Sequence, residues 1–398
     1  MQILIVFLIC DFTGVILNMK KIVIVCAFIC SLFSLSAYEW GGLFSEYFKV
    51  NFAGKTIEDP KFRQSNSASL WVSAPIADEK LFFSGQTTYK YNFDFGSNNL
   101  FFSVFDFDLI KFSSQIEFRQ SVATINFGRF YMQDNTGAVF SQKVDAVSLI
   151  TNFTHCEMTL FFGYTGLLNS INDVMLGQNR IPHVQNGMFY LPAHKYVPVI
   201  FSLKFPSVFF NQQLDFEADA FFDLEQDNFN RFYATMALSG PVSSFMFYKI
   251  SSTFGAENFN KFTNYSSIKT NFIVSDSLLC NVNLEYASGN QLFFSEFTGF
   301  TSHTAYNSSL YPELSGVILP SVDLVFSFMD YYSAFSVKTV FDYPEIQINF
   351  KGVEVCGNLV LNVFSDLQIS LSGLYYMDLL TEGVENNIAV NVNCSFTF

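Results

Sequence analysis

The chain has 398 residues and a formal net charge of −14, with 21 basic side chains against 35 acidic ones. Binding to nucleic acids relies on Lys and Arg at the phosphates, so this acidic balance argues against a nucleic-acid partner. Half of the residues are hydrophobic, with 52 Phe and 19 Tyr, and only 14% are charged, which is more apolar surface than a soluble protein usually hides.

The start of the chain has the pattern of an export signal. A basic segment at 19–21 precedes an apolar stretch, 22–33, that is too short to span a membrane. Small residues follow at 34–37 and suit cleavage by a signal peptidase. The pattern therefore predicts a protein that is exported and cleaved.

We assign 1–37 to a signal-peptide region, with Met19 as the expected true start, and 38–398 to one mature domain. The alternative is a lipoprotein signal that uses Cys26 or Cys30. Neither cysteine follows the usual small-residue pattern, so the cleaved signal peptide is preferred.

Beyond position 37 the sequence lacks the run of about 18 to 20 apolar residues that a transmembrane helix needs. Alternating apolar and polar residues are common instead, and about 9 to 11 such residues suit a tilted strand that crosses a bilayer. The pattern predicts about 18 strands, within a range of roughly 14 to 18. They lie near 41–50, 68–76, 81–94, 100–112, 116–131, 143–153, 157–167, 197–207, 214–227, 231–241, 244–255, 266–275, 278–290, 316–329, 334–343, 356–365, 367–378 and 388–398.

The final segment has the clearest alternation. Apolar residues occupy every even position from Ile388 to Phe398, and the odd positions between them are small or polar. Successive side chains of a strand point to opposite faces, so this strand has one apolar face and one polar face.

The connections between the expected strands alternate in length. From the C-terminus backwards, 379–387 is long, 365–366 short and 344–355 long, and further back 256–265 is long and 242–243 short. Short turns on one side and long loops on the other are typical of membrane barrels, with the short turns facing the periplasm. The sequence thus predicts an all-β, antiparallel, up-and-down transmembrane barrel. A secreted β-sandwich or propeller does not explain these long strands or the one-sided loops.

The polar faces of the strands hold the candidate functional residues of the barrel interior. If the apolar parity faces lipid, as expected for Phe105, Phe107 and Leu109, the charged residues between face a water-filled lumen, because burying them dry would be costly. Two roles stay open for the carboxylates: pairing with wall lysines, or selection of cations. The predicted lumen residues are Lys90, Asp94, Asp106, Asp108, Asp215, Glu217, Asp219, Lys269, Glu285, Asp323 and Lys338.

One loop, 168–196, is long enough to enter the lumen and narrow it. Its charged and imidazole side chains are the constriction candidates Asp173, Arg180, His183, His194 and Lys195. The alternative is an exposed adhesive or antigenic loop, and constriction is preferred because long structured loops tend to be functional. A second loop, 291–315, carries Phe293, Phe294, Phe297 and Phe300, which are expected at the bilayer interface or around an apolar ligand.

With these features the chain resembles a bacterial outer-membrane porin, a barrel of roughly 16 to 18 strands. The export signal, the strands from 68 to 398 and the terminal Phe398 carry the resemblance. In addition, Gly128-Arg129-Phe130 with the following segment 134–147 is similar to the strand-loop-strand region around a Gly-Arg in several substrate-selective porins. It departs from that pattern at Asp145-Ala146, where those porins have Asp-Gly. The segment 40–42 resembles spirochaete outer-membrane proteins.

The resemblance implies an outer-membrane channel through which small hydrophilic solutes diffuse. The expected partners are outer-membrane lipid, small solutes and the barrel-assembly machinery, which would recognise the C-terminal strand through Phe396 and Phe398. A homotrimer is the assembly that classical porins imply. The alternatives are a surface adhesin or antigen anchored by a barrel, and a transporter of the fatty-acid type with a hatch formed by 38–67.

Catalysis finds little support in the sequence. The motifs GxSxG, HExxH and the P-loop are absent, and the four histidines, His155, His183, His194 and His303, lie in expected loops or turns. We therefore expect no enzymatic activity, no cofactor and no metal site.

Overall fold

The computed structural model describes residues 39–53, 61–76, 80–95, 100–118, 121–171, 190–225, 230–291, 293–301, 314–345, 347–380 and 387–398. The chain divides into two compact units, Met1–Glu39 and Trp40–Phe398, and the account below concerns the second. The expected signal region, 1–37, lies outside the described residues.

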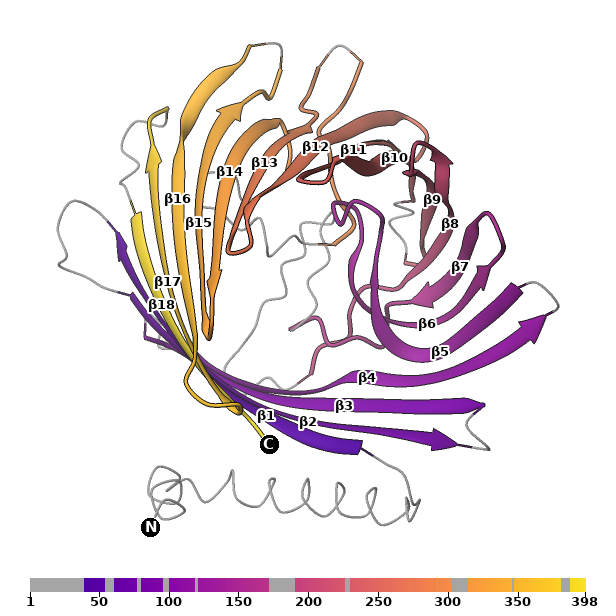
Figure 1. Ribbon diagram of the computed structural model, residues 1–398, viewed down its shortest axis with the longest axis horizontal. Coiled ribbons are helices and arrows are strands. Elements are labelled where there is room, and N and C mark those ends of the chain that lie inside the picture. The colour runs from indigo at the N-terminus through magenta and orange to yellow at the C-terminus, as the bar shows by residue number, and fades with distance from the viewer. Residues whose placement is uncertain are drawn as a thin grey trace. The chain divides into compact units, whose positions relative to one another are not determined.

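The described part of the chain forms one antiparallel sheet of 18 strands (Figure 1). Their bounds are β1 (Glu39–Ala53), β2 (Lys61–Ile76), β3 (Leu81–Phe95), β4 (Leu100–Phe118), β5 (Ser121–Gln133), β6 (Ser141–Asn152), β7 (Glu157–Tyr164), β8 (Tyr196–Phe209), β9 (Gln212–Asp223), β10 (Arg231–Ser243), β11 (Met246–Glu257), β12 (Lys261–Ser275), β13 (Leu278–Ala287), β14 (Val317–Phe328), β15 (Tyr331–Asp342), β16 (Asn349–Asn362), β17 (Leu367–Asp378) and β18 (Asn387–Thr397).

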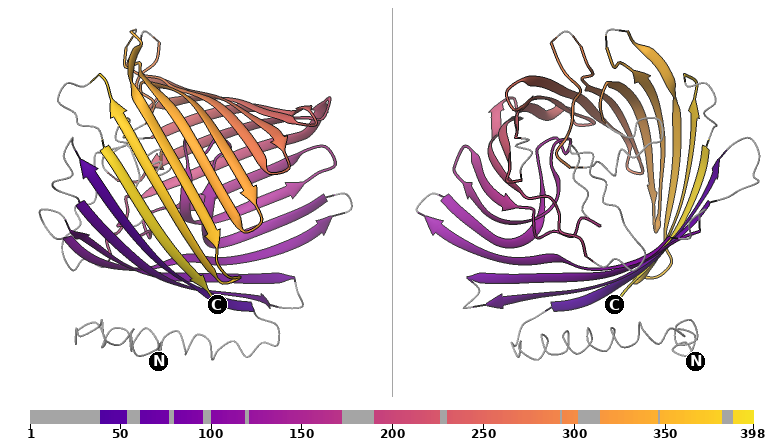
Figure 2. Two further views of the ribbon diagram at one scale, coloured as in Figure 1. Left: turned by 60° about the vertical axis from the view of Figure 1, so that its left-hand side comes forward. Right: turned by 180° about the vertical axis from the view of Figure 1, so that it is seen from behind.

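Each strand pairs with its neighbours in sequence, and β1 pairs with β18, so the sheet closes on itself (Figure 2). The closing register runs from Leu43↔Thr397 to Ala53↔Asn387. Closure gives the first and last strands a partner for their N–H and C=O groups, which is what a lipid environment demands of a sheet. The predicted up-and-down barrel and its strand number are confirmed.

Among the residues that the structure describes, no helix is long and apolar enough to cross a membrane.

Connections differ between the two ends of the barrel, as predicted. At one end the strands are joined by short turns such as 210–211, 244–245 and 329–330, whereas at the other the segments 165–195 and 288–316 are long. The expectation of a long loop at 256–265 is wrong. The strands β11 and β12 extend to Glu257 and from Lys261, and only a three-residue turn with Asn258 and Phe259 at positive φ joins them.

One strand departs from the predicted parity. The register between β3 and β4 passes from Thr87↔Phe107 to Gln86↔Leu109, so Asp108 is an extra residue in β4. This bulge shifts the following side chains by one face. Leu109 therefore packs against the interior cluster instead of facing lipid, while Asp106 and Asp108 both reach inward partners.

The outward faces are apolar and exposed, and the inner face holds both charged groups and a cluster of buried apolar side chains. That cluster joins residues of β5 to β10, β12 to β15 and β17 to two inward-folded connections, which contribute Val139, Phe140, Phe297 and Phe300. The barrel is thus partly filled from within, and the remaining inner wall is polar.

The chain end closes the seam of the barrel. The backbone N–H of Gly42 donates to Phe398 O and that of Phe398 donates to Gly42 O, both at 3.0 Å. The Phe398 ring lies on Phe44, with the ring centroids 5.7 Å apart and 27° between the planes. Phe396 lies in register with Phe44 on the same outward face.

We expect Phe398→Ala to lower the free energy of unfolding by about 1 kcal/mol, because it removes the aromatic pair and leaves the backbone bonds intact. Urea titration of the refolded protein in lipid vesicles measures this. The matched control is Phe335→Ala, on the outward face far from the seam, since the two rings belong to residues of similar exposure, 49% and 46%. An equal loss in both variants would contradict a special role for the seam.

Candidate functional site

The main feature of the interior is a hairpin that leaves the barrel wall. The strands β5 and β6 stay paired from Val122↔Asn152 to Gln133↔Ser141. The pairing of β4 with β5, however, ends at Ile110↔Arg129. Beyond that point the hairpin, including its turn 134–140, bends into the barrel (Figures 1 and 2). We call residues 129–145 the inner hairpin.

Gly128 makes the bend possible. Its φ is +117°, a conformation that residues with a side chain rarely adopt, and an added Cβ would lie 2.0 Å from Ile110 O. Only glycine allows the backbone of β5 to pass so close to β4.

At its base the inner hairpin is tied to β4 by charged side chains. Arg129 binds Asp145 through two hydrogen bonds of 2.8 Å, and its Nη1 also donates to Phe107 O at 3.4 Å. Lys143 Nζ lies 2.5 Å from Asp106 Oδ2 and 2.8 Å from Asp108 Oδ1. Two of the predicted lumen acids, Asp106 and Asp108, are therefore partners of the hairpin base.

The parity of these residues explains the contacts. Arg129 and Lys143 share the strand face that carries Phe127 and Val147. Phe127 and Val147 point outward, with exposures of 58% and 44%. Because the hairpin bends inward after Gly128, the continuation of that face meets the inner wall of β4 instead of lipid.

The hairpin turn is built around one carboxylate. Asp134 accepts hydrogen bonds from the backbone N–H groups of Thr136 (2.9 Å), Gly137 (3.1 Å), Val139 (3.1 Å) and Phe140 (2.7 Å). Such local bonds from Asp to the following backbone hold turns in one shape. The turn is therefore rigid before it meets the opposite wall.

The tip of the hairpin contacts β9 and β11. The N–H of Asn135 donates to Glu217 Oε1 at 2.7 Å, and Lys249 Nζ donates to Asn135 O and Oδ1 at 2.6 and 2.8 Å. Behind these polar contacts, Phe140 is fully buried, with ring centroids 5.6 Å from Phe221 and 5.7 Å from Phe300. The tip is thus fixed by both charge and packing.

Three predicted acids form a group on the inner face of β9. Asp215 accepts from Gln213 Nε2 at 2.8 and 3.0 Å, and Glu217 binds the hairpin tip. Asp219 is 2% exposed, and both of its carboxylate oxygens lack a hydrogen-bond partner among the described residues. The three carboxyl groups alternate along one strand and share its inner face.

The loop between β13 and β14 also enters the barrel. Phe300 N donates to Val139 O at 2.7 Å, and Phe297 and Phe300 are each 1% exposed. The expectation that they lie at the bilayer interface or around an apolar ligand is wrong, because both pack inside the barrel against the hairpin and the wall. Phe293, in contrast, is 85% exposed.

The predicted constriction loop is described only at its two ends. Asp173, Arg180 and His183 lie outside the described residues. His194 Nε2 lies 2.8 Å from Asp223 Oδ1 and its Nδ1 lies 3.0 Å from Glu225 Oε2, so this end of the loop is bound to β9 and the residues after it.

Lys195 contributes a backbone contact at the same end, where its carbonyl accepts from Leu224 N at 3.0 Å. The other end touches the inner hairpin, because Arg129 Nη2 donates to Leu167 O at 2.8 Å.

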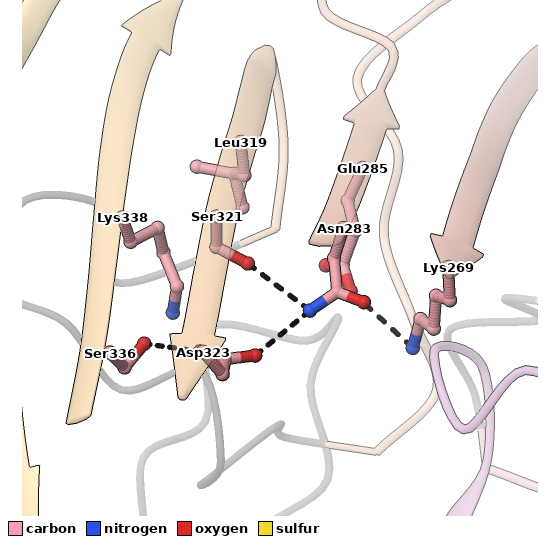
Figure 3. Close-up of a pocket in the computed structure, with 8 residues that line it drawn as sticks. All are labelled: Lys269, Asn283, Glu285, Leu319, Ser321, Asp323, Ser336 and Lys338. Carbon is pink, nitrogen blue, oxygen red and sulfur yellow. Dashed lines mark hydrogen bonds and ion pairs between the residues drawn. The ribbon is translucent and has the colours of Figure 1, made fainter. Parts of the chain in front are cut away.

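A pocket of about 240 Å³ lies on the opposite part of the inner wall, across β12 to β15 (Figure 3). It collects four predicted lumen residues on one surface. Its lining residues are Lys269, Asn283, Glu285, Leu319, Ser321, Asp323, Ser336 and Lys338.

Hydrogen bonds and ion pairs order the pocket. Asp323 accepts from Asn283 Nδ2 at 2.9 Å and from Ser336 Oγ at 2.5 Å. Lys269 Nζ lies 3.4 Å from Glu285 Oε1. Lys338 Nζ lies 3.7 Å from Glu354 Oε1, outside the pocket lining.

The remaining predicted lumen residues lie on β3. Lys90 is opposite Ser67 of β2 and Val104 of β4. Asp94 pairs in register with Arg63, and its side chain lies outside the described part of the structure. Lys90 is not among the residues of the pocket or of the hairpin contacts described above.

The inner hairpin is the part of the site that the sequence analysis did not find. Its signal was present, because Arg129, Lys143 and Asp145 stand on the parity that carries the outward-facing Phe127 and Val147. Charged residues on a lipid-facing parity indicate that the strand has left the lipid surface.

Within the described residues, no three His, Cys, Asp or Glu side chains are grouped so that they could hold a metal ion.

No protein-family model and no curated protein sequence matches the chain. Solved structures do match it. The outer membrane protein OpdK from Pseudomonas aeruginosa has a TM-score of 0.61 at 9% identity, with 92% of this chain and 99% of that chain covered. OccK11 (OpdR) from the same organism has a TM-score of 0.60 at 8% identity, over 91% and 96% of the two chains. OccAB4 from Acinetobacter baumannii has a TM-score of 0.59 at 9% identity, over 92% and 99%.

OpdK has also been crystallised with vanillate. At these low identities the likeness establishes that the chain shares the barrel fold of these proteins.

We expect Gly128→Ala to lower the free energy of unfolding by about 2 kcal/mol or more, because a side chain at positive φ is strained and its Cβ collides with a carbonyl. Urea unfolding in lipid vesicles, followed by Trp fluorescence, measures the change. The control is Gly357→Ala in β16, where an added Cβ meets no atom within 4 Å. Equal stability of the two variants would show that the bend does not depend on glycine.

Proposed function

We propose that this protein is an outer-membrane channel through which small hydrophilic solutes diffuse. The observation that carries the proposal is a closed sheet of 18 strands with an apolar outer face and charged side chains along its inner wall. Ionised groups on such a wall require water beside them, and a water-filled barrel is a route for polar solutes. The shared fold with OpdK, an outer membrane protein, supports this location.

The inner hairpin supplies the constriction in this proposal. Its turn is stiffened by Asp134, and Lys249 and Glu217 hold its tip on the far wall. A rigid obstacle at fixed height limits the size of the solutes that pass. The loop 168–196 is proposed to narrow the channel further.

The charges of the wall favour a weak preference for cations. Asp106, Asp108 and Glu285 have cationic neighbours within 3.4 Å, so these carboxylates act mainly as wall partners. On β9, Asp215 is bound by the neutral amide of Gln213, while Glu217 binds the hairpin tip and Asp219 is buried. A mobile cation would be attracted to this group.

Export and assembly complete the proposal. The signal region 1–37 directs the chain across the inner membrane, and the C-terminal strand with Phe396 and Phe398 is recognised by the barrel-assembly machinery before insertion into lipid. A homotrimer is the proposed assembly. No catalytic step is assigned to the protein.

We expect refolded protein in planar bilayers to give stable single-channel current steps. Removal of residues 136–138 from the hairpin turn should increase the step size, because this segment occupies the interior with Ala138 fully buried. The control is Asp366→Asn in the short turn 363–366 at the other end of the barrel, which should leave the steps unchanged. A barrel that conducts no current in either form would favour the adhesin or antigen that a barrel anchors.

We expect the triple variant Asp215→Asn, Glu217→Gln, Asp219→Asn to lower the cation-to-anion permeability ratio by about twofold, because it removes negative charge beside the path. Reversal potentials in a salt gradient measure the ratio. Asp366→Asn again serves as the control, and an unchanged ratio in the triple variant would remove the β9 acids from selectivity.

A further inference from the structure

We infer that the pocket on β12 to β15 is a binding site for small zwitterions, solutes that carry one ammonium and one carboxylate group. The inference rests on the proposed channel function, in which such a solute would enter the barrel. It concerns a defined part of the wall and the chemical class of ligand that this part accepts.

The charge content of the pocket is balanced. Lys269 and Lys338 supply two ammonium groups, and Glu285 and Asp323 supply two carboxylates, so the lining has no net formal charge. A ligand with a single charge would be attracted to the two groups of opposite charge and repelled by the two groups of like charge. A ligand with both charges finds a partner for each.

The groups differ in how firmly they are held. Asp323 is fixed by Asn283 and Ser336, and Lys338 Nζ lies 3.7 Å from Glu354 Oε1. The side chains of Lys269 and Lys338 are 35% and 19% exposed, against 10% for Glu285. The ammonium groups are therefore open to a ligand carboxylate, and the preset carboxylate of Asp323 is positioned for a ligand ammonium.

The size of the pocket limits the ligand. Its volume of about 240 Å³ is below the roughly 300 to 1,000 Å³ of pockets for drug-sized molecules. Leu319, which is 2% exposed, is the one apolar lining residue, and it would contact a short aliphatic part of the ligand. These dimensions fit a solute the size of a small amino acid.

A continuous row of paired residues links the pocket to the wall residue that binds the hairpin tip. One row of paired residues crosses the wall from Lys249, which binds the tip, through Lys269, Asn283 and Ser321 to Lys338. Adjacent strands lie about 4.8 Å apart, so Ser321 stands about 15 Å along the wall from the tip anchor. The pocket therefore begins one strand away from Lys249, on the inner face of the barrel.

Ligand-observed saturation-transfer NMR on the full-length mature protein in detergent micelles tests the inference. The probes are alanine, lactate and isopropylamine, which share a methyl signal and a similar size but carry both charges, only the negative charge and only the positive charge. We expect saturable binding of alanine, with lactate and isopropylamine at least about fivefold weaker, since each loses one charge-assisted contact.

The variants Lys338→Gln and Asp323→Asn should each weaken alanine binding by about fivefold or more, because each removes the partner of one ligand charge. The matched control is Lys204→Gln on β8, a wall lysine that pairs with Glu157 at 3.0 Å and lies outside the pocket lining. Folding of every variant is checked by its heat-modifiable gel mobility. If lactate binds as well as alanine and Asp323→Asn has no effect, or if none of the variants changes binding, the zwitterion site is wrong.

The same experiment separates this inference from the channel function. Binding in micelles needs no open pore, so alanine binding by a protein without conductance would retain the pocket and reject the channel. Conductance without alanine binding would retain the channel and reject the pocket.

Discussion

Closure of the sheet between β1 and β18 is the interaction on which the rest of the structure depends. In hydrocarbon, each unpaired backbone N–H or C=O costs several kcal/mol, and a sheet avoids this cost only when its first and last strands pair. The register from Leu43↔Thr397 to Ala53↔Asn387 provides that pairing, and the terminal Phe398 extends it to Gly42. Once the sheet is closed, every strand has one face toward lipid and one toward the interior, so the charged side chains gather inside.

The inner hairpin shows how the same constraint is met where the wall is incomplete. The residues of β4 that precede Ile110 are not paired with β5, and this edge of β4 faces the base of the hairpin. Arg129 donates to the carbonyl of Phe107, and both Arg129 and Lys143 place a cation beside Asp106. Side chains thus replace part of a missing strand, which explains why these cations occur at positions where lipid-facing residues would otherwise stand.

Much of the fold follows from residue parity, because the apolar outer face imposes a strict period of two on the strands. Strand number, closure and the one-sided loops were predictable in this way, and four predicted residues, among them Asp323 and Lys338, meet in one pocket. The bulge at Asp108 was not predictable, since parity shifts there without a mark in the composition. The inward bend at Gly128 was not found either, although the charged Arg129, Lys143 and Asp145 on the face of Phe127 and Val147 were a sign of it.

The distribution of charge inside the barrel differs from what the net charge of −14 suggests. On the hairpin side, the ammonium group of Lys143 pairs with the carboxylates of Asp106 and Asp108. In the pocket, Lys269 pairs with Glu285. Each of these three inward carboxylates therefore has a cation within 3.4 Å. Attraction between such pairs in an environment of reduced dielectric holds the side chains in place and cancels their long-range field. At the hairpin base, however, three carboxylates face the two cations Arg129 and Lys143, and on β9 the carboxyl group of Asp219 is buried without a hydrogen-bond partner among the described residues. The wall therefore acts on a passing solute through individual sites at defined heights, and not as a uniformly acidic tube.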